Sequence, residues 1–143
     1  MIANINLPRI LRVGAGVSGQ LVTSLNELGL ARPLLVTDPF MLECGYCERL
    51  EAPLRAAGMQ YGLFSDCVPD PTTDSVYAAL AQLREGDYDC VVALGGGSSL
   101  DTAKAVAVLA EHGGIMRDYK VPRQVDSGLP IIAIPTTAGT GSE

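Results

Sequence analysis

Three glycine-rich segments of the chain have the composition of a phosphate-binding loop. They are residues 14–19 (GAGVSG), residues 95–98 (GGGS) and residues 135–142 (PTTAGTGS). Glycine lets backbone N–H groups approach an anion without interference from a Cβ atom, and the free N–H groups at the start of a helix attract phosphate. We therefore take these three segments as candidates for binding the phosphates of a nucleotide.

The first segment matches the GxGxxG pattern of dinucleotide-binding proteins, and Asp38 follows at roughly the twenty-residue spacing typical of that pattern. The run before it, Ile10–Val13, contains Arg12 and follows Arg9. It is therefore less apolar than the central strand of a Rossmann sheet. Two interpretations stay open: a pyrophosphate site, or a turn whose glycines let the chain bend into a helix.

The second segment follows the most apolar run of the chain, Cys90–Leu94, and precedes a helical pattern that begins at Ser98. Asp101 lies three residues after Ser98, which is capping-box spacing. The positive end of the helix dipole would reinforce the backbone donors of this loop. We predict the main phosphate site here, on Gly95, Gly96, Gly97 and Ser98. The alternative is a plain strand-to-helix connection, and the segment lacks the GK[ST] of a Walker loop.

The third segment adds hydroxyl groups to its glycines. Thr136 and Thr137 directly follow a predicted strand and could hydrogen-bond a nucleotide held at the neighbouring strand end. Taken alone this is weak evidence, because stretches of glycine and threonine are often plain loops.

Asp38 directly follows the apolar run 34–37 and so lies at the carboxyl end of a predicted strand. A carboxylate there can accept hydrogen bonds from the ribose hydroxyls of NAD and would repel the 2′-phosphate of NADP. The alternative is that Asp38 caps a helix that begins at Pro39. We favour the ribose role, because the other candidate sites also point to a nucleotide.

Cys44 and Cys47 form a CxxC pair, a pattern found in thiol redox sites and in zinc sites. A thioredoxin-like redox pair would need a thiol of lowered pKa at a helix start. A zinc site would need a second pair or nearby histidines, and His112 is the only histidine. We favour incidental cysteines that remain reduced thiols.

Short apolar or β-branched runs alternate with helical patterns along the whole chain. We predict strands at Ile10–Val13, Pro33–Thr37, Tyr61–Phe64, Cys90–Leu94 and Ile131–Ile134. We predict helices that start near Ser18, before Leu50, at Thr72 or Thr73 and at Ser98, and that end at Gly29, Gly58, Gly86 and Gly113. The alternation predicts an α/β fold with a doubly wound, mostly parallel, Rossmann-like sheet. Ligands of such sheets bind outside the carboxyl ends of the strands.

Composition narrows the class of protein further. The 143 residues suit one domain, 48% of them are hydrophobic, and the formal net charge is −6. Clustered lysines and arginines, which binding to nucleic acid needs, are missing from the sequence. No apolar run is long enough to cross a bilayer, and residues 1–12 lack the features of a signal peptide. We expect a cytoplasmic protein that binds neither nucleic acid nor membrane.

Two long motifs resemble those of one enzyme family. Residues 95–104 (GGGSSLDTAK) fit the pattern GGGSxxDxAK, and residues 134–143 (IPTTAGTGSE) fit the block that follows it in the iron-containing (group III) alcohol dehydrogenases. Residues 36–38 (VTD) and 68–72 (VPDPT) resemble further segments of the same family. The resemblance runs along essentially the whole chain and is identified with the family's N-terminal nucleotide-binding domain.

The resemblance implies a role for each candidate residue. The pyrophosphate of NAD would lie on Gly95–Ser98, and residues 14–19 would be a structural turn. Asp38 would bind the ribose, Thr136 and Thr137 would lie near the nucleotide, and Asp101 would face the nicotinamide. The set implied to bind the cofactor is Asp38, Gly95, Gly96, Gly97, Ser98, Asp101, Thr136 and Thr137. Lys104 would be structural, and His112 a surface residue.

The resemblance also implies a longer enzyme. Family members carry a second, helical domain with the metal ligands, and that domain is absent from residues 1–143. We therefore expect an N-terminal portion of an NAD-dependent oxidoreductase that acts on a small alcohol or aldehyde by metal-assisted hydride transfer. We assign no catalytic or metal-binding residue, expect iron or another divalent metal only in the full-length enzyme, and expect this portion alone to be inactive. We also expect a homo-oligomer. The alternative function is a stand-alone nucleotide-binding module without catalytic activity.

Overall fold

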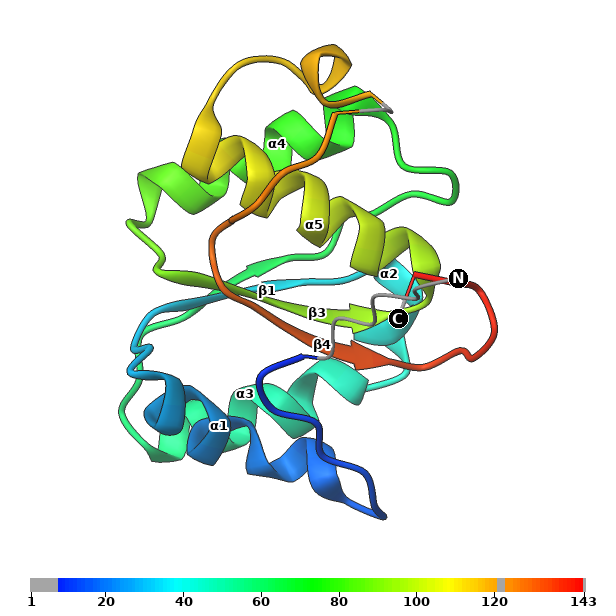
Figure 1. The fold of residues 1–143 in the computed structure, drawn as a ribbon. Helices are drawn as coiled ribbons and strands as arrows, with labels where there is room; N and C mark the ends of the chain where they lie inside the picture. The colour runs from blue at the N-terminus through cyan, green and yellow to red at the C-terminus, as the bar shows by residue number, and fades with distance from the viewer. Residues whose placement is uncertain (1–7, 121–122, 143) are drawn as a thin grey trace, which may run out of the picture.

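Four parallel strands form a sheet in the middle of the molecule, and helices cover both of its faces (Figure 1). The computed structural model describes residues 8–120 and 123–142. The strands are β1 (Pro33–Val36), β2 (Gly62–Phe64), β3 (Cys90–Gly95) and β4 (Ile131–Pro135). Their order in the sheet is β2-β1-β3-β4, and every pairing is parallel. The predicted doubly wound α/β fold is confirmed.

The helices lie on the two faces of the sheet as connections between the strands (Figure 1). One face carries α1 (Leu21–Leu28), α2 (Pro39–Glu43) and α3 (Tyr46–Ala56). The other face carries α4 (Thr73–Glu85) and α5 (Gly97–His112). Two short 3₁₀ helices, η1 (Val17–Gln20) and η2 (Met116–Tyr119), lie before α1 and after α5.

The central strands are buried on both sides, which explains why their sequences are continuously apolar. Leu34 and Val36 of β1 pack into the core beneath α4 and α5, whereas Leu35 between them packs into the core beneath α1 and α3. In β3, Val91 packs beneath α4 and α5, and Val92 packs beneath α1 and α3. Successive side chains of a strand point to opposite faces, so a sheet covered on both faces needs apolar residues at every position.

Most of the predicted helix boundaries are confirmed. Gly29 and Gly58 take left-handed φ values of 70° and 66° after α1 and α3, a conformation that glycine adopts at little cost. Thr72 is the N-cap of α4, and its side chain accepts a hydrogen bond from the Ser75 amide at 3.2 Å. The start predicted at Ser18 is wrong, because this residue lies inside η1 and α1 begins after Gln20 without a side-chain cap.

The strand predicted at Ile10–Val13 is also wrong, because this segment has no regular structure. Leu11 and Val13 are 72% and 87% exposed, and Arg12 between them hydrogen-bonds Gln20 and Glu27. A short apolar run forms a strand only where a neighbouring strand and a covering layer bury at least one of its faces. Here the charged Arg12 is held against α1 instead.

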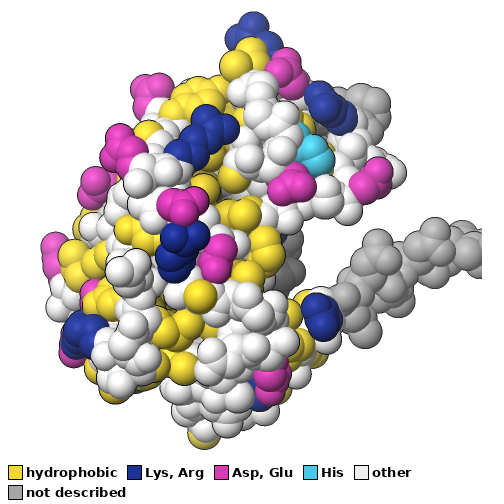
Figure 2. Space-filling view, turned by 90° about the vertical axis from the view of Figure 1, so that its left-hand side faces the viewer, with side chains coloured by type: hydrophobic (Ala, Val, Ile, Leu, Met, Phe, Trp, Pro, Cys, Tyr) yellow, Lys and Arg dark blue, Asp and Glu magenta, His cyan; other side chains and the backbone are white. Residues whose placement is uncertain are grey.

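The surface of the described residues mixes charges of both signs with apolar groups. Figure 2 looks at the side of the molecule from which the strands start, and hydrophobic side chains reach the surface there between acidic and basic ones. Among the helices that the structure describes, none has the length and apolar character needed to span a bilayer.

Candidate nucleotide-binding site

The candidate residues meet where the sheet reverses its winding direction. After β1 the chain passes to α2 and α3 on one face, and after β3 it passes to α5 on the other. Because β1 and β3 are neighbours, the two connections diverge at the carboxyl ends of these strands. Doubly wound sheets bind their ligands at this position, and we refer to the region between the two connections as the crevice. The Thr37 hydroxyl closes the base of the crevice by donating to the Leu94 carbonyl at 2.8 Å.

Asp38 lies at the end of β1 and interacts through both carboxylate oxygens. Its Oδ1 accepts a hydrogen bond from the Met41 amide at 3.0 Å, so the residue is the N-cap of α2. Its Oδ2 accepts a hydrogen bond from the Ser99 hydroxyl of α5 at 3.3 Å. The capping role that the sequence left open is therefore real, and it holds the carboxylate at the mouth of the crevice. Each carboxylate oxygen has a second lone pair for a further donor.

The Gly95–Ser98 loop leads from β3 into α5, and it leaves almost no room for a side chain at Gly95. Gly95 has a φ of +143°, and a Cβ atom there would lie 2.6 Å from Ser99 Oγ and 3.0 Å from Asp38 Oδ2. Gly96 is the N-cap of α5 and has no side chain to cap it. The first amides of a helix lack intrahelical acceptors, so the start of α5 presents donors to the crevice.

The capping box predicted between Ser98 and Asp101 is wrong. The helix α5 begins at Gly97, one residue earlier than predicted, so Ser98 is its second residue and not its cap. This early start leaves the Asp101 carboxylate free to bond elsewhere: its Oδ2 accepts from the Ser142 hydroxyl at 2.9 Å, and its Oδ1 lies 3.4 Å from Lys104 Nζ. Asp101 and Lys104 thus face the loop that follows β4.

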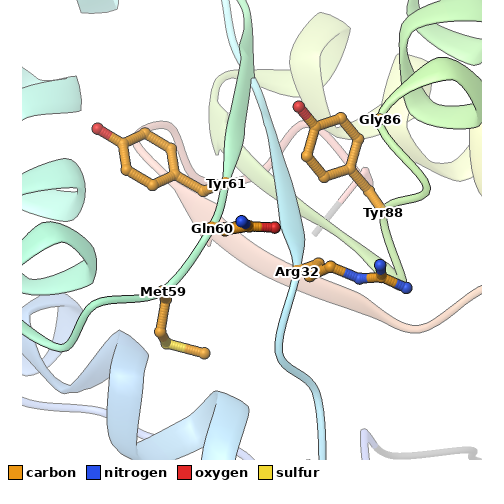
Figure 3. A pocket seen from close by; sticks show the side chains of 6 residues that line it. All are labelled: Arg32, Met59, Gln60, Tyr61, Gly86 and Tyr88. Atoms are coloured by element: carbon orange, nitrogen blue, oxygen red, sulfur yellow. The ribbon is translucent and has the colours of Figure 1, made fainter.

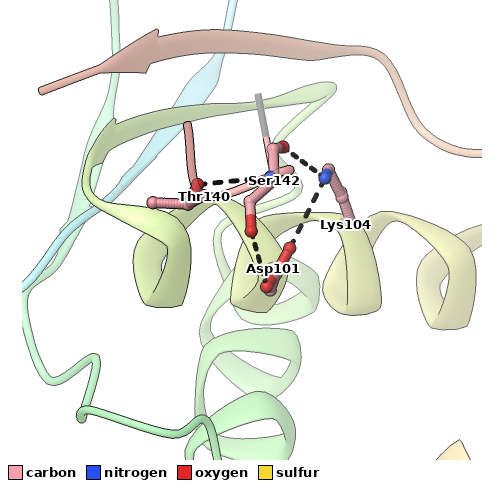
Figure 4. A network of polar contacts seen from close by, with 4 residues as sticks. All are labelled: Asp101, Lys104, Thr140 and Ser142. Atoms are coloured by element: carbon pink, nitrogen blue, oxygen red, sulfur yellow. Dashed lines mark hydrogen bonds and ion pairs between the residues drawn. The ribbon is translucent and has the colours of Figure 1, made fainter. Parts of the chain in front are cut away.

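The loop after β4 folds back over the start of α5. The Thr136 amide donates to the Gly95 carbonyl at 2.9 Å, and a Cβ atom at Gly96 would lie 3.5 Å from Thr137 Oγ1. At its far end, Ser142 bonds to both Asp101 and Lys104 (Figure 4). A Cβ atom at Gly97 would lie 3.0 Å from Ser142 Oγ. The threonine- and serine-rich loop thus lies against the glycine loop.

All eight residues predicted to bind the cofactor therefore come from three neighbouring strand ends. Asp38 follows β1, and the two threonines follow β4. Gly95 is the last residue of β3, Gly96 comes next, and Gly97, Ser98 and Asp101 lie in the first turns of α5. Sequence reasoning missed Ser99 and Ser142, which connect these groups. Ser99 is 0% exposed, and a serine on the inward face of a mostly apolar helix was the available signal.

The GxGxxG segment lies outside this crevice. Its glycines make a turn that enters η1, with the Val17 amide donating to the Gly14 carbonyl at 3.3 Å and the Gly19 amide to the Gly16 carbonyl at 3.0 Å. No strand precedes it in the described residues. A Rossmann phosphate loop must follow a strand so that the next helix points at the ligand, and this turn does not.

The cysteine pair lacks the features of a redox site. Cys44 is exposed, whereas Cys47 is 1% exposed. Burial raises the pKa of the Cys47 thiol, and this reduces the fraction of reactive thiolate. The arrangement favours the interpretation of incidental cysteines.

The described residues offer no ligand set for a metal ion. They contain no group of three or more His, Cys, Asp and Glu side chains placed to hold one. His112 ends α5, where its Nε2 lies 2.9 Å from the Ser127 carbonyl oxygen. Its prediction as a surface residue is confirmed, since the side chain is exposed.

A separate hollow of about 400 Å³ lies at the opposite edge of the sheet (Figure 3). It is lined by residues that precede the strands, among them Arg32 before β1, Tyr61 before β2 and Tyr88 before β3. It is therefore distinct from the crevice at the carboxyl ends.

Comparison with known proteins gives the family. The family model described as iron-containing alcohol dehydrogenase matches residues 8–143. The chain belongs to this family. A long-chain-alcohol dehydrogenase of Geobacillus thermodenitrificans is 41% identical over 146 residues, which cover 99% of this chain and 37% of the relative. The NAD-dependent methanol dehydrogenase of Bacillus methanolicus is 36% identical over 98% of this chain and 37% of its own length.

The solved structures agree with the sequence comparison. The sulfoacetaldehyde reductase of Bifidobacterium kashiwanohense, solved in complex with NAD⁺, superimposes with a TM-score of 0.87 and 33% identity. It covers 100% of this chain, and this chain covers 38% of it. The chain thus spans little more than a third of the length of the relatives it matches. The resemblance read from the two long motifs is confirmed, including its assignment to an α/β domain of these dehydrogenases.

Proposed function

We propose that residues 1–143 form the NAD-binding domain of an oxidoreductase that interconverts a small alcohol and its aldehyde. The observation that carries the proposal is the meeting of Asp38 and the Gly95–Ser98 loop at the crevice between β1 and β3. That crevice is where doubly wound sheets bind nucleotides. The NAD⁺ complex of a structural relative and the NAD dependence named for a sequence relative support the choice of cofactor.

Each residue of the crevice has a task suited to NAD. The Asp38 carboxylate accepts hydrogen bonds from the ribose hydroxyls and repels the 2′-phosphate of NADP. The amides of Gly95, Gly96, Gly97 and Ser98, at the positive end of α5, donate to the pyrophosphate. Thr136 and Thr137 follow β4 and contact the nucleotide from that side. Asp101, on α5, lies near the nicotinamide.

When bound, NAD⁺ would supply the hydride acceptor for oxidation of the alcohol, and Asp38 and the Gly95–Ser98 loop would hold it. In this proposal the divalent metal that assists the reaction is held by residues outside 1–143; the support is that the chain covers only 37% and 38% of two of its relatives. Residues 1–143 alone then bind NAD weakly and do not turn over alcohol. This domain contributes binding and orientation of the cofactor, and the choice of alcohol belongs to the other side of the cleft.

The test uses the whole protein in which these residues occur, with NADH and NADPH titrated by fluorescence. Asp38→Asn keeps the helix cap, since asparagine caps as well as aspartate, but removes the negative charge. We expect the affinity for NADPH relative to NADH to rise at least about tenfold, the size of one charge-assisted hydrogen bond. Asp101→Asn removes the same charge elsewhere in the crevice and should leave this ratio unchanged.

A second measurement tests the reaction. The whole protein with ferrous ion should reduce NAD⁺ in the presence of a primary alcohol or diol, and residues 1–143 alone should not. Turnover by residues 1–143 alone would overturn the proposed division of labour. Binding of NADH by the whole protein without any turnover would instead favour a nucleotide-binding module.

A further inference from the structure

The Ser99 hydroxyl makes a contact that connects the two halves of the crevice. Ser99 is a residue of α5, is fully buried, and donates to Asp38 Oδ2 at 3.3 Å across 61 positions of sequence. The Ser99 side chain points inward between α5 and the end of β1. The bond therefore joins the connection that follows β1 to the connection that follows β3.

Two anchors from opposite sides of the sheet fix the Asp38 carboxylate. The Met41 amide of α2 holds Oδ1 and the Ser99 hydroxyl of α5 holds Oδ2. The terminal torsion of an aspartate side chain is broad when nothing holds it. With one anchor on each oxygen, the plane of the carboxylate is set.

The contact between Ser99 and Asp38 requires a glycine at position 95. At Gly95 a Cβ atom would collide with Ser99 Oγ and press on Asp38 Oδ2. The carbonyl of Gly95, one turn before Ser99, already accepts the Thr136 amide at 2.9 Å. A buried serine in a helix commonly bonds to the carbonyl one turn back, but here its hydroxyl points to Asp38.

The hydrogen bond to Asp38 distinguishes Ser99 from Thr102, the next buried hydroxyl of α5. Thr102 lies three residues later on α5 and is equally buried, yet its Oγ1 has no hydrogen-bond partner among the described residues. The thiol of Cys67 lies beside both hydroxyls, and its burial raises its pKa to about 11, so it remains protonated at neutral pH. Ser99 is thus the one of these two hydroxyls that acts on Asp38.

We propose that Ser99 is a positioning residue that sets the preference for NAD over NADP by orienting the Asp38 carboxylate toward the ribose. The proposal rests on the proposed function, in which Asp38 binds the ribose. Without the Ser99 hydroxyl the carboxylate keeps only the Met41 anchor and can turn away. It then binds the two ribose hydroxyls less well and repels a 2′-phosphate less strongly.

The experiment measures dissociation constants of NADH and NADPH for the whole protein carrying Ser99→Ala. We expect weaker NADH binding and unchanged or tighter NADPH binding, so that the preference for NADH falls about fivefold to tenfold. Thr102→Val removes an equally buried hydroxyl from the same helix and should leave the preference unchanged. Loss of packing alone would weaken both cofactors together and leave their ratio intact.

A double-variant cycle tests whether Ser99 acts through Asp38. In an Asp38→Asn background, Ser99→Ala should change the ratio by less than about twofold, because the charge to be oriented is gone. Ser99→Cys is the second variant, since a thiol is a weak donor of similar size, and its ratio should move in the same direction as that of Ser99→Ala.

The outcomes separate the two proposals. If the wild-type protein binds NADH no better than NADPH, or Asp38→Asn leaves the ratio unchanged, the ribose role of Asp38 fails, and the role of Ser99 fails with it. If Asp38→Asn shifts the ratio but Ser99→Ala and Ser99→Cys do not, only the role of Ser99 is overturned.

Discussion

Lys104 of α5 donates a hydrogen bond to the backbone carbonyl of Ser142, 38 positions later in the chain. The same ammonium group lies 3.4 Å from Asp101, which accepts the Ser142 hydroxyl (Figure 4). The one cation thus contacts two groups, the Asp101 carboxylate on the helix and the Ser142 carbonyl on the loop. Lys104, expected from the family resemblance to be structural, helps to hold the loop after β4 against the start of α5.

Replacing Lys104 with methionine should loosen that loop without unfolding the domain. Because Lys104 and Asp101 are half exposed, the contact is worth only about 1 kcal/mol. Hydrogen–deuterium exchange of the amides in residues 137–142 should therefore speed up about fivefold. Lys120→Met removes a lysine from the segment after η2 and should leave this exchange unchanged. Equal exchange in the two variants would contradict the role given to Lys104.

Gly95→Ala should be among the more destabilising substitutions in the site. The new Cβ atom would lie 2.6 Å from Ser99 Oγ, at a φ of +143° that other residues rarely adopt. Overpacking and backbone strain together predict a loss of about 2–4 kcal/mol in the free energy of unfolding, measured with urea. Gly29→Ala has a similarly unfavourable φ of +70° but open space around it, and should cost only about 1–2 kcal/mol. Equal losses would mean that the close approach to Ser99 is unimportant.

The Tyr88 ring and Gly86 should be coupled in a double-mutant cycle. A Cβ atom at Gly86 would overlap the Tyr88 ring, and one at Gly62 would overlap it too. Gly86 itself has an ordinary helical φ of −86°, so alanine suits its backbone. We expect Gly86→Ala to cost about 1–3 kcal/mol in the wild type and to be neutral or stabilising after Tyr88→Ala. Additive effects in urea unfolding would argue against this packing.

The buried thiols should make stability fall in alkaline solution. Burial raises the pKa of Cys67 from its ordinary 9.0 to about 11, and it raises the pKa of Cys90 and Cys47 as well. The folded state then holds these protons more tightly than the unfolded state. The stability is fully present below pH 9 and is lost as the pH rises toward 11, by about 2–3 kcal/mol for Cys67.

The measurement is the free energy of unfolding from pH 8 to pH 11. Cys67→Ala should flatten this decline relative to the wild type, whatever it costs in packing at neutral pH. Cys44→Ala serves as the control, because the Cys44 side chain is exposed and should leave the slope unchanged. A Cys67→Ala curve parallel to that of the wild type would refute the explanation.

The fold was largely predictable because its signals are local. The continuous apolar run of β3 reflects burial on both faces, and Gly29 and Gly58 mark helix ends through backbone conformations that other residues avoid. The predicted strand at Ile10–Val13 failed because its pattern was local too. Whether Leu11 and Val13 become buried depends on a neighbouring strand, and a short apolar run carries no information about that neighbour.

The sequence by itself determined the parallel α/β architecture, the family, and the residue types available for a nucleotide at three strand ends. The tertiary structure decided which of them touch. It joined Asp38 to Ser99, and Asp101 and Lys104 to Ser142, and it left the GxGxxG turn outside the crevice. The physical reason is that strand order and the direction in which each connection leaves the sheet arise from the packing of the whole chain. Contacts between residues 38 to 61 positions apart follow from that packing and not from local spacing.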